Sequence, residues 1–195
     1  MNPLICQLIQ VVELPQDLQF EINSATTYRQ LAKNVRIISS GNTCHEMHFL
    51  ASGLARVFYY KDGKDVTAWF SAENQIVNAV DSLIMGTPTF YNIELLEDSE
   101  VYSVPLQKIQ QIFFKYPAIQ KLGLLLLTKR YLTMDERIKS FASCRAEERY
   151  EKLVQQLPDI FNRVKLGHIA SYIGITQEHL SRLRGNYKLQ SKKRV

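Results

Sequence analysis

The residues with the clearest chemistry lie in one segment, Val164–Leu183, whose spacing predicts two helices joined by a tight turn. Gly174 suits the turn, because a left-handed backbone is favourable for glycine. Thr176 stands where the N-cap of the second helix belongs. The positions that would face inward are apolar: Ile169, Ala170, Ile173, Leu180 and Leu183. This combination predicts a helix-turn-helix of the kind that enters the major groove of DNA.

The outward side of the second predicted helix carries side chains that can read base edges: Gln177, Glu178, Ser181 and Arg182. Arg182 can donate two hydrogen bonds to guanine, and Gln177 can pair with adenine. Glu178 can accept a hydrogen bond from cytosine N4, although an acid at a helix N-terminus also has a favourable interaction with the helix dipole. The sequence favours base reading but leaves this alternative open for Glu178.

Charge is distributed unevenly and supports the same interpretation. Residues 1–140 hold thirteen basic and fourteen acidic side chains, whereas residues 141–195 hold eleven basic and five acidic ones. Such asymmetry is typical of a nucleic-acid-binding module, although a solvated basic tail would also produce it. The expected phosphate contacts, which position without specifying, are Thr176, His179, Arg184 and Lys188.

The composition excludes several other classes of protein. The chain has 195 residues, of which 46% are hydrophobic and 22% charged, as in an ordinary folded protein. It has no apolar run near 20 residues and no signal-peptide pattern, so we expect a cytoplasmic protein without a membrane partner. Cys6, Cys44 and Cys144 are far apart, which argues for free thiols and against a zinc or iron–sulfur site.

The elements that must position the helix-turn-helix follow a pattern of strands and then helices. Residues 31–105 contain short β-rich segments separated by turn residues, with Asp62-Gly63 as a hairpin signal, which predicts an antiparallel barrel or sandwich. After Pro105 the apolar spacing becomes helical. We therefore expect an α+β protein with three parts, namely residues 1–116, a long helix over 117–142, and residues 143–195.

The predicted long helix has a heptad seam, made by Leu124, Leu127, Tyr131, Met134 and Ile138. A second apolar stripe lies on another face, at Ala118, Leu122, Leu125 and Leu132. One stripe can pack on the chain's own sheet, and the other then needs a partner, for which a second copy of the helix is the simplest choice. Burial of the whole helix inside one domain is the alternative.

These three parts together resemble the Crp/Fnr family of bacterial transcription regulators over nearly the whole chain. The resemblance rests on Ile37–Gly41, Phe49–Tyr59, Asp62-Gly63, Arg137–Tyr150 and, most specifically, Val164–Leu183. It implies an N-terminal double-stranded, jelly-roll-like β-roll, dimerisation through the long helix, and a winged-helix-like DNA-binding domain. It further implies double-stranded DNA, a second subunit and RNA polymerase as partners. Gln177, Glu178 and Arg182 fall on the positions with which the family reads bases.

The sequence departs from the family where a cyclic nucleotide would bind. The family's glycine, glutamate and arginine positions hold Asn78, Ala79 and Thr89, and no arginine occurs between Arg56 and Arg130. A buried phosphate without a cation or glycine-rich amides would be costly, so we expect no cyclic AMP and no cofactor. The second helix is followed only by residues 185–195, so a complete wing is not expected, and the alternative is that Lys188–Arg194 lie disordered along phosphates.

Three other interpretations explain the sequence less well. A β-roll that binds a small molecule, with weak or vestigial DNA binding, is the main alternative. A cupin-like metalloenzyme would need His45 and His48 to face one metal, but residues three apart on a strand point to opposite faces. No catalytic triad, carboxylate pair or phosphate-binding loop is recognisable, so we expect no enzymatic activity.

Overall fold

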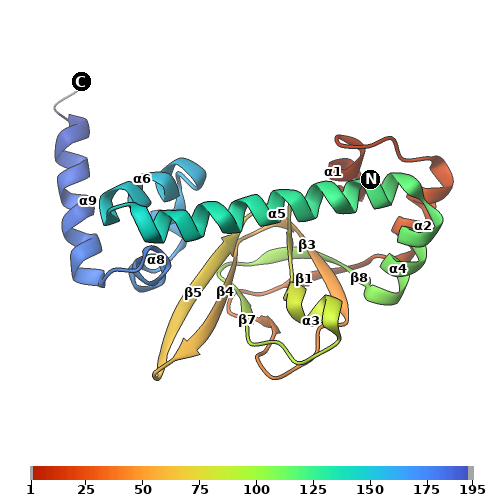
Figure 1. Ribbon diagram of the computed structural model, residues 1–195, viewed down its shortest axis with the longest axis horizontal. Helices are drawn as coiled ribbons and strands as arrows, with labels where there is room; N and C mark the ends of the chain where they lie inside the picture. The colour runs from red at the N-terminus through yellow and green to blue at the C-terminus, as the bar shows by residue number, and fades with distance from the viewer. Residues whose placement is uncertain (1, 193–195) are drawn as a thin grey trace. The chain divides into compact units, whose positions relative to one another are not determined.

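The computed structural model describes residues 2–192, with side chains up to residue 185. The chain forms two compact units, one made of residues 1–59 and 69–131 and the other of residues 60–68 and 132–195. The first unit holds most of the strands, and the second holds the C-terminal helices (Figure 1). The three domain boundaries expected from the sequence remain a prediction.

Two four-stranded antiparallel sheets form the β-rich part, as the sequence predicts. One has the order β1-β8-β3-β6 and the other β2-β7-β4-β5. The strands are β1 (Thr27–Leu31), β2 (Arg36–Ile38), β3 (Glu46–Ser52), β4 (Ala55–Lys61), β5 (Lys64–Ser71), β6 (Gln75–Val77), β7 (Asn92–Leu95) and β8 (Ser99–Pro105). The order is non-sequential, which gives the jelly-roll-like arrangement expected for the β-roll.

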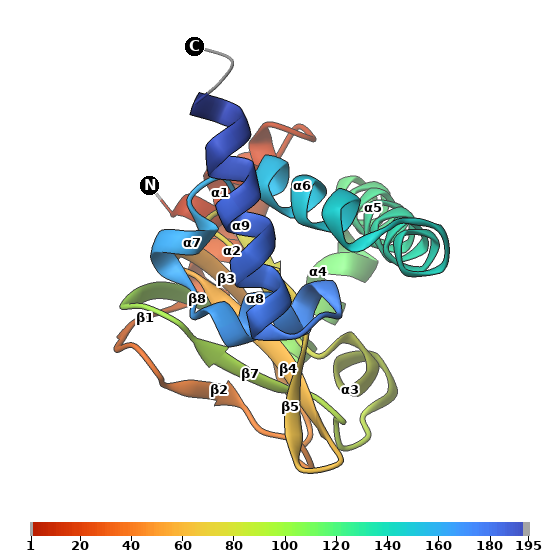
Figure 2. The ribbon, with the colours of Figure 1, turned by 90° about the vertical axis from the view of Figure 1, so that its left-hand side faces the viewer.

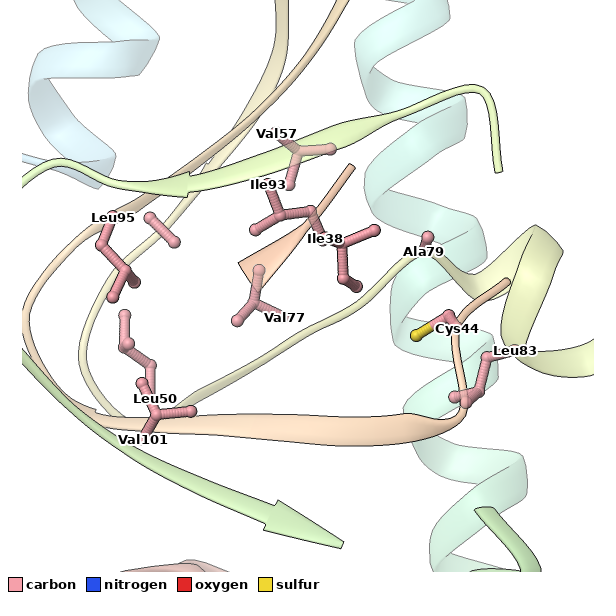
Figure 3. Packing of buried hydrophobic residues seen from close by; sticks show 11 residues of the cluster. Ile38, Cys44, Leu50, Val57, Val77, Ala79, Leu83, Ile93, Leu95 and Val101 are labelled. Carbon is pink, nitrogen blue, oxygen red and sulfur yellow. The ribbon is translucent and has the colours of Figure 1, made fainter. Parts of the chain in front are cut away.

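The alternation of residues along the strands explains the core of the roll. Side chains of β2, β3, β4, β6, β7 and β8, together with three residues outside the strands, converge into an apolar cluster, shown in Figure 3: Ile38, Cys44, Leu50, Ala55, Val57, Val77, Ala79, Leu83, Ile93, Leu95 and Val101. Several of them, including Leu50, Val57 and Ile93, are fully buried. These side chains therefore occupy the space between the two sheets.

The sequence patterns missed some short elements. Helix α1 (Pro3–Ile9) and strand β1 were not expected, and the irregular stretch 73–88 contains β6 and helix α3 (Val80–Met85). Helix α2 (Gln16–Ala25) buries Leu18 and Ile22. Helix α4 (Leu106–Lys115) also follows its predicted pattern and ends before Tyr116.

One histidine lies inside the first unit. His48 on β3 is 5% exposed, and its Nδ1 lies 2.8 Å from the Ser103 hydroxyl on β8. Burial lowers the pKa of His48 to about 4, although Glu46 acts in the opposite direction. In the unfolded chain the His48 imidazole is protonated below its ordinary pKa of 6.5, whereas in the folded chain it is protonated only near pH 4. The free energy of unfolding therefore falls as the pH drops through that window.

We expect protonation of this histidine to cost about 2 kcal/mol of stability between pH 7 and pH 4.5. His48→Gln should make the pH dependence of unfolding correspondingly shallower, as measured by urea denaturation at both pH values. His45→Gln is the matched control, because His45 is exposed and precedes the same strand. Equal pH dependence in wild type and His48→Gln would contradict the expectation.

Helix α5 (Pro117–Ser143) is 27 residues long and crosses from the first unit into the second (Figure 1). The seam residues Leu124, Leu127, Tyr131 and Ile138 are between 58% and 70% exposed, and Met134 is half-buried. On the second stripe Leu122 is buried, but Leu125 and Leu132 are 46% and 53% exposed. The chain itself therefore covers Leu122 on the second stripe but leaves Leu125 and Leu132 open.

The second unit contains α6 (Ala146–Gln156), α7 (Ile160–Arg163), α8 (Leu166–Ile173) and α9 (Gln177–Lys192). Figure 2 shows α8 beside the start of α9. Helix α9 runs to Lys192, eight residues beyond the end expected at Arg184. The alternative of a disordered segment over Lys188–Arg194 is wrong for residues 188–192, and residues 193 and 194 lie outside the described residues. Among the described residues no strand follows α9.

Candidate nucleic-acid interface

The turn between α8 and α9 has the geometry that the sequence predicts. Gly174 ends α8 in the left-handed region, at φ 74° and ψ 40°. The Ile175 N–H donates to the Ala170 carbonyl at 3.0 Å, which completes the helix end. The Thr176 hydroxyl accepts from the His179 N–H at 3.2 Å, so Thr176 is the N-cap of α9 as expected.

Apolar side chains hold the two helices together. Ile169, Ala170, Ile173 and Leu180 are at most 2% exposed, and Leu183 is half-buried. The small Ala170 side chain lies at this contact, which allows the close crossing that its size predicts. The inner face read from the sequence is therefore confirmed.

Gly174 also lies against a bulky neighbour. A Cβ atom at this position would stand 2.7 Å from Cε1 of Phe141. Gly174→Ala should therefore lower the free energy of unfolding by about 3 kcal/mol, from backbone strain and from the clash. Gly63→Ala separates these causes, because Gly63 has the same φ of +74° and nothing lies within 4 Å of where its Cβ would stand. We expect about 1 kcal/mol for that control by thermal denaturation, and equal losses would rule out the Phe141 contact.

The four side chains expected to read bases share the exposed side of α9. Gln177, Glu178, Ser181 and Arg182 are all exposed, within the first two turns of the helix. The Gln177 Oε1 atom lies close to Gly167 of α8, 3.3 Å from where a Cβ would stand. The arrangement presents donors and acceptors at a helix N-terminus, which is the part that enters a major groove.

Glu178 takes part in local interactions at the start of α9. Its own backbone N–H, the Thr176 hydroxyl and the Arg182 charge hold the pKa of its carboxyl below the usual value. It therefore stays ionised and interacts favourably with the helix N-terminus. The helix-dipole alternative left open by the sequence has a physical basis here, and base reading by Glu178 remains a prediction.

The expected phosphate contacts differ in their surroundings. Thr176 is exposed and His179 is half-buried. The Arg184 guanidinium lies 4.8 Å from the centre of the Phe161 ring, so it also packs inside its own unit. The backbone of Lys188 belongs to α9, while its side chain lies outside the described residues.

The tip of the β4–β5 hairpin belongs to the same unit as these helices. The Thr67 N–H donates to the Ser171 hydroxyl of α8 at 2.7 Å. His168 Nε2 of α8 lies 3.9 Å from a carboxylate oxygen of Asp65. These contacts give α8 a neighbour that no local sequence pattern indicates.

The residues at the expected effector site are already paired or buried. Ala79 is fully buried and precedes α3, and Asn78 is half-buried. Thr89 is 3% exposed and its hydroxyl lies 3.3 Å from a carboxylate oxygen of Asp81. An acid therefore stands beside the position where the family has an arginine, and it would repel a phosphate.

Aromatic side chains near this position form a connected cluster. The Trp69 and Tyr91 rings are 5.1 Å apart, and the Tyr59 and Phe90 rings 4.9 Å apart. The Arg130 guanidinium of α5 lies 4.2 Å from the Trp69 ring centre. Trp69 packs against the core of the roll, whereas Tyr60 is 56% exposed.

No group of three or more metal-ligating side chains occurs within residues 2–192. His45 lies outside β3 and is exposed, whereas His48 is buried on it, so the two histidines have different surroundings. Over the same part of the chain no helix is long and apolar enough to cross a membrane.

The family model for the cyclic nucleotide-binding domain matches residues 28–116. A curated relative, the global nitrogen regulator of Nostoc sp. (strain PCC 7120), is 27% identical over 179 residues, covering 84% of this chain and 78% of the relative. Among solved structures, FixK2 from Bradyrhizobium japonicum superposes with a TM-score of 0.75, at 14% identity, over 85% of this chain and 86% of its own. A structure from Eubacterium rectale that is assigned to the Crp/Fnr family superposes with a TM-score of 0.70, at 15% identity, over 91% of this chain and 85% of its own. These likenesses establish the fold.

Proposed function

We propose that the chain is a DNA-binding transcription regulator of the Crp/Fnr type, acting as a homodimer that reads a palindromic operator with α9. The observation that carries this proposal is the exposure of Gln177, Ser181 and Arg182 together on the first turns of α9. In a symmetric dimer the two copies of α9 would enter successive major grooves about 34 Å apart.

The exposed seam of α5 supports dimerisation. Large apolar side chains such as Leu124, Tyr131 and Ile138 are about two-thirds exposed and follow a heptad spacing. Exposed apolar surface of this regularity is best buried against an identical helix. The operator should therefore have two-fold symmetry. We further propose RNA polymerase as a partner, because the resemblance to the family implies it.

The paired Thr89 and Asp81 support an effector other than cyclic AMP. The cyclic nucleotide-binding domain keeps its fold here, but a phosphate placed near Thr89 would meet a carboxylate instead of a guanidinium. We expect 1 mM cyclic AMP to leave the melting temperature of the protein unchanged in a thermal-shift assay. A rise that grows with nucleotide concentration would contradict this, since selective binding stabilises the folded state.

Selection of bound sequences from a random DNA pool tests the proposed function. The expected result is a two-fold symmetric motif, with affinity that falls steeply with salt, at a log–log slope near −5 for about six phosphate contacts. A bound pool without enrichment would reject operator reading. If DNA binding is also weak and insensitive to salt, the alternative of a small-molecule-binding roll with vestigial DNA binding would be favoured.

A further inference from the structure

The end of α8 has a complete set of partners for its last four backbone carbonyls. Those of Ala170 and Ser171 accept from the backbone N–H groups of Ile175 and Gly174. The remaining two carbonyls, of Tyr172 and Ile173, would lack a partner in an isolated helix. The partners come from two arginines far away in the sequence, Arg137 and Arg149.

Arg137 of α5 donates from Nη2 to the Tyr172 carbonyl at 3.1 Å. Arg149 of α6 donates from Nε to the Ile173 carbonyl at 2.8 Å. Positive charge at a helix C-terminus is favourable in itself, because the carbonyl dipoles point toward it. The two guanidinium groups therefore cap α8 both electrostatically and by direct hydrogen bonds.

Arg149 also holds the end of α5. Its Nη1 donates to the Cys144 carbonyl, directly after the last residue of α5, at 2.6 Å. One planar guanidinium thus joins the C-terminal ends of α5 and α8. A lysine could not make both contacts, because its ammonium is a single point on a flexible chain.

Phe141 fills the space between these groups. Its ring lies 5.0 Å from the Arg137 guanidinium and 5.1 Å from that of Arg149. Arg137 in addition lies 4.0 Å from the centre of the Tyr172 ring. Together with the close approach of Phe141 to Gly174, these contacts fix the turn against the last two turns of α5.

We infer that Arg137 and Arg149 are positioning residues for operator recognition, acting through the backbone of the turn that leads into α9. Only Gly174, Ile175 and Thr176 separate the capped end of α8 from Gln177. Capping the last carbonyls therefore fixes where the exposed residues of α9 begin, relative to the end of α5. This inference rests on the proposed function, since it assigns a role in the same DNA contact.

If the two arginines position α9, their substitution should weaken discrimination between the operator and random DNA, rather than weaken binding to all DNA. Base contacts need an accurate pose, whereas phosphate contacts tolerate small displacements and supply the non-specific affinity. Arg149→Gln should lower the ratio of operator to random-duplex affinity about tenfold. Arg149→Lys keeps the charge, but we expect its ratio to stay close to that of Arg149→Gln.

Arg145→Gln is the matched control, because Arg145 precedes the same helix, loses the same charge and has an 86% exposed side chain. Affinities of wild type and of the three variants are measured by fluorescence anisotropy on the selected operator and on a random duplex, across a salt series. The expected result is a tenfold lower ratio only in the Arg149 variants, with the salt slope equal in Arg149→Gln and Arg145→Gln.

Equal affinity ratios in Arg149→Gln and Arg145→Gln would overturn the inference, because charge alone would then explain Arg149. If Arg149→Gln does not fold, by circular dichroism, Arg137→Met provides the same test because it removes the donor to the Tyr172 carbonyl, and an unchanged ratio in that variant overturns the inference. Failure of the wild type to select any motif would reject the proposed function itself. A wild type that selects an operator, with variants that discriminate equally well, rejects only the positioning role.

Discussion

Arg182→Ala is expected to lower the affinity for the selected operator about 10- to 100-fold and to relax the preference at a single base pair of each half-site. Arg182 is exposed on the second turn of α9, and its guanidinium can donate two parallel hydrogen bonds to one guanine. Loss of a phosphate contact would instead weaken binding to all sequences by a similar factor. The measurement is the affinity for the operator and for its single-base variants.

Arg145→Ala controls for the loss of one positive charge in the same unit, at a side chain that is 86% exposed and directly precedes α6. It should change the affinities for operator and random DNA by the same small factor. If Arg182→Ala behaves like Arg145→Ala, then Arg182 contributes only charge, and the base-reading assignment fails.

Leu127→Glu is expected to convert the dimer into monomers and to lower operator affinity by about 100-fold or more. In a symmetric seam the substitution buries two unpaired carboxylates, which costs several kcal/mol. Leu127 is 58% exposed in the single chain, so the monomer itself should tolerate the change. Sedimentation equilibrium measures the change in association state.

Leu132→Glu is the matched control, because Leu132 is similarly exposed, at 53%, but lies on the other stripe of the same helix. It should leave the dimer intact. Dissociation by Leu132→Glu but not by Leu127→Glu would move the seam to the other face of α5.

The helix-turn-helix could be predicted because its determinants are local. Gly174, Thr176 and the apolar residues around them act within a single segment, so their spacing alone predicts the turn, the cap and the inner face. The long helix was predictable for the same reason, since apolar periodicity is a local property. The strands of the roll followed from alternation and turn residues.

Other features could not be predicted, because they depend on contacts between distant segments. Arg137 and Arg149 donate to backbone carbonyls, which have no side-chain signature in the sequence. The pairing of Asp81 with Thr89 supports the absence of a phosphate site, but only the fold of the roll brings the two together. Helix α9 was expected to end at Arg184, but it continues through Gly185 to Lys192, although glycine is unfavourable in a helix interior.

The face of α5 around Met134 and Ile138 would make recognition of DNA depend on the concentration of the protein. These two side chains line an open groove of about 520 Å³ together with Arg137, Phe141 and Ala142. A partner helix seated on the seam would displace water from this groove and lower the local dielectric around the Arg137 guanidinium. The attraction between that guanidinium and the α8 carbonyls would then strengthen. By linkage, association of two chains and correct presentation of α9 would favour each other, so discrimination between DNA sequences would sharpen as the protein becomes more abundant.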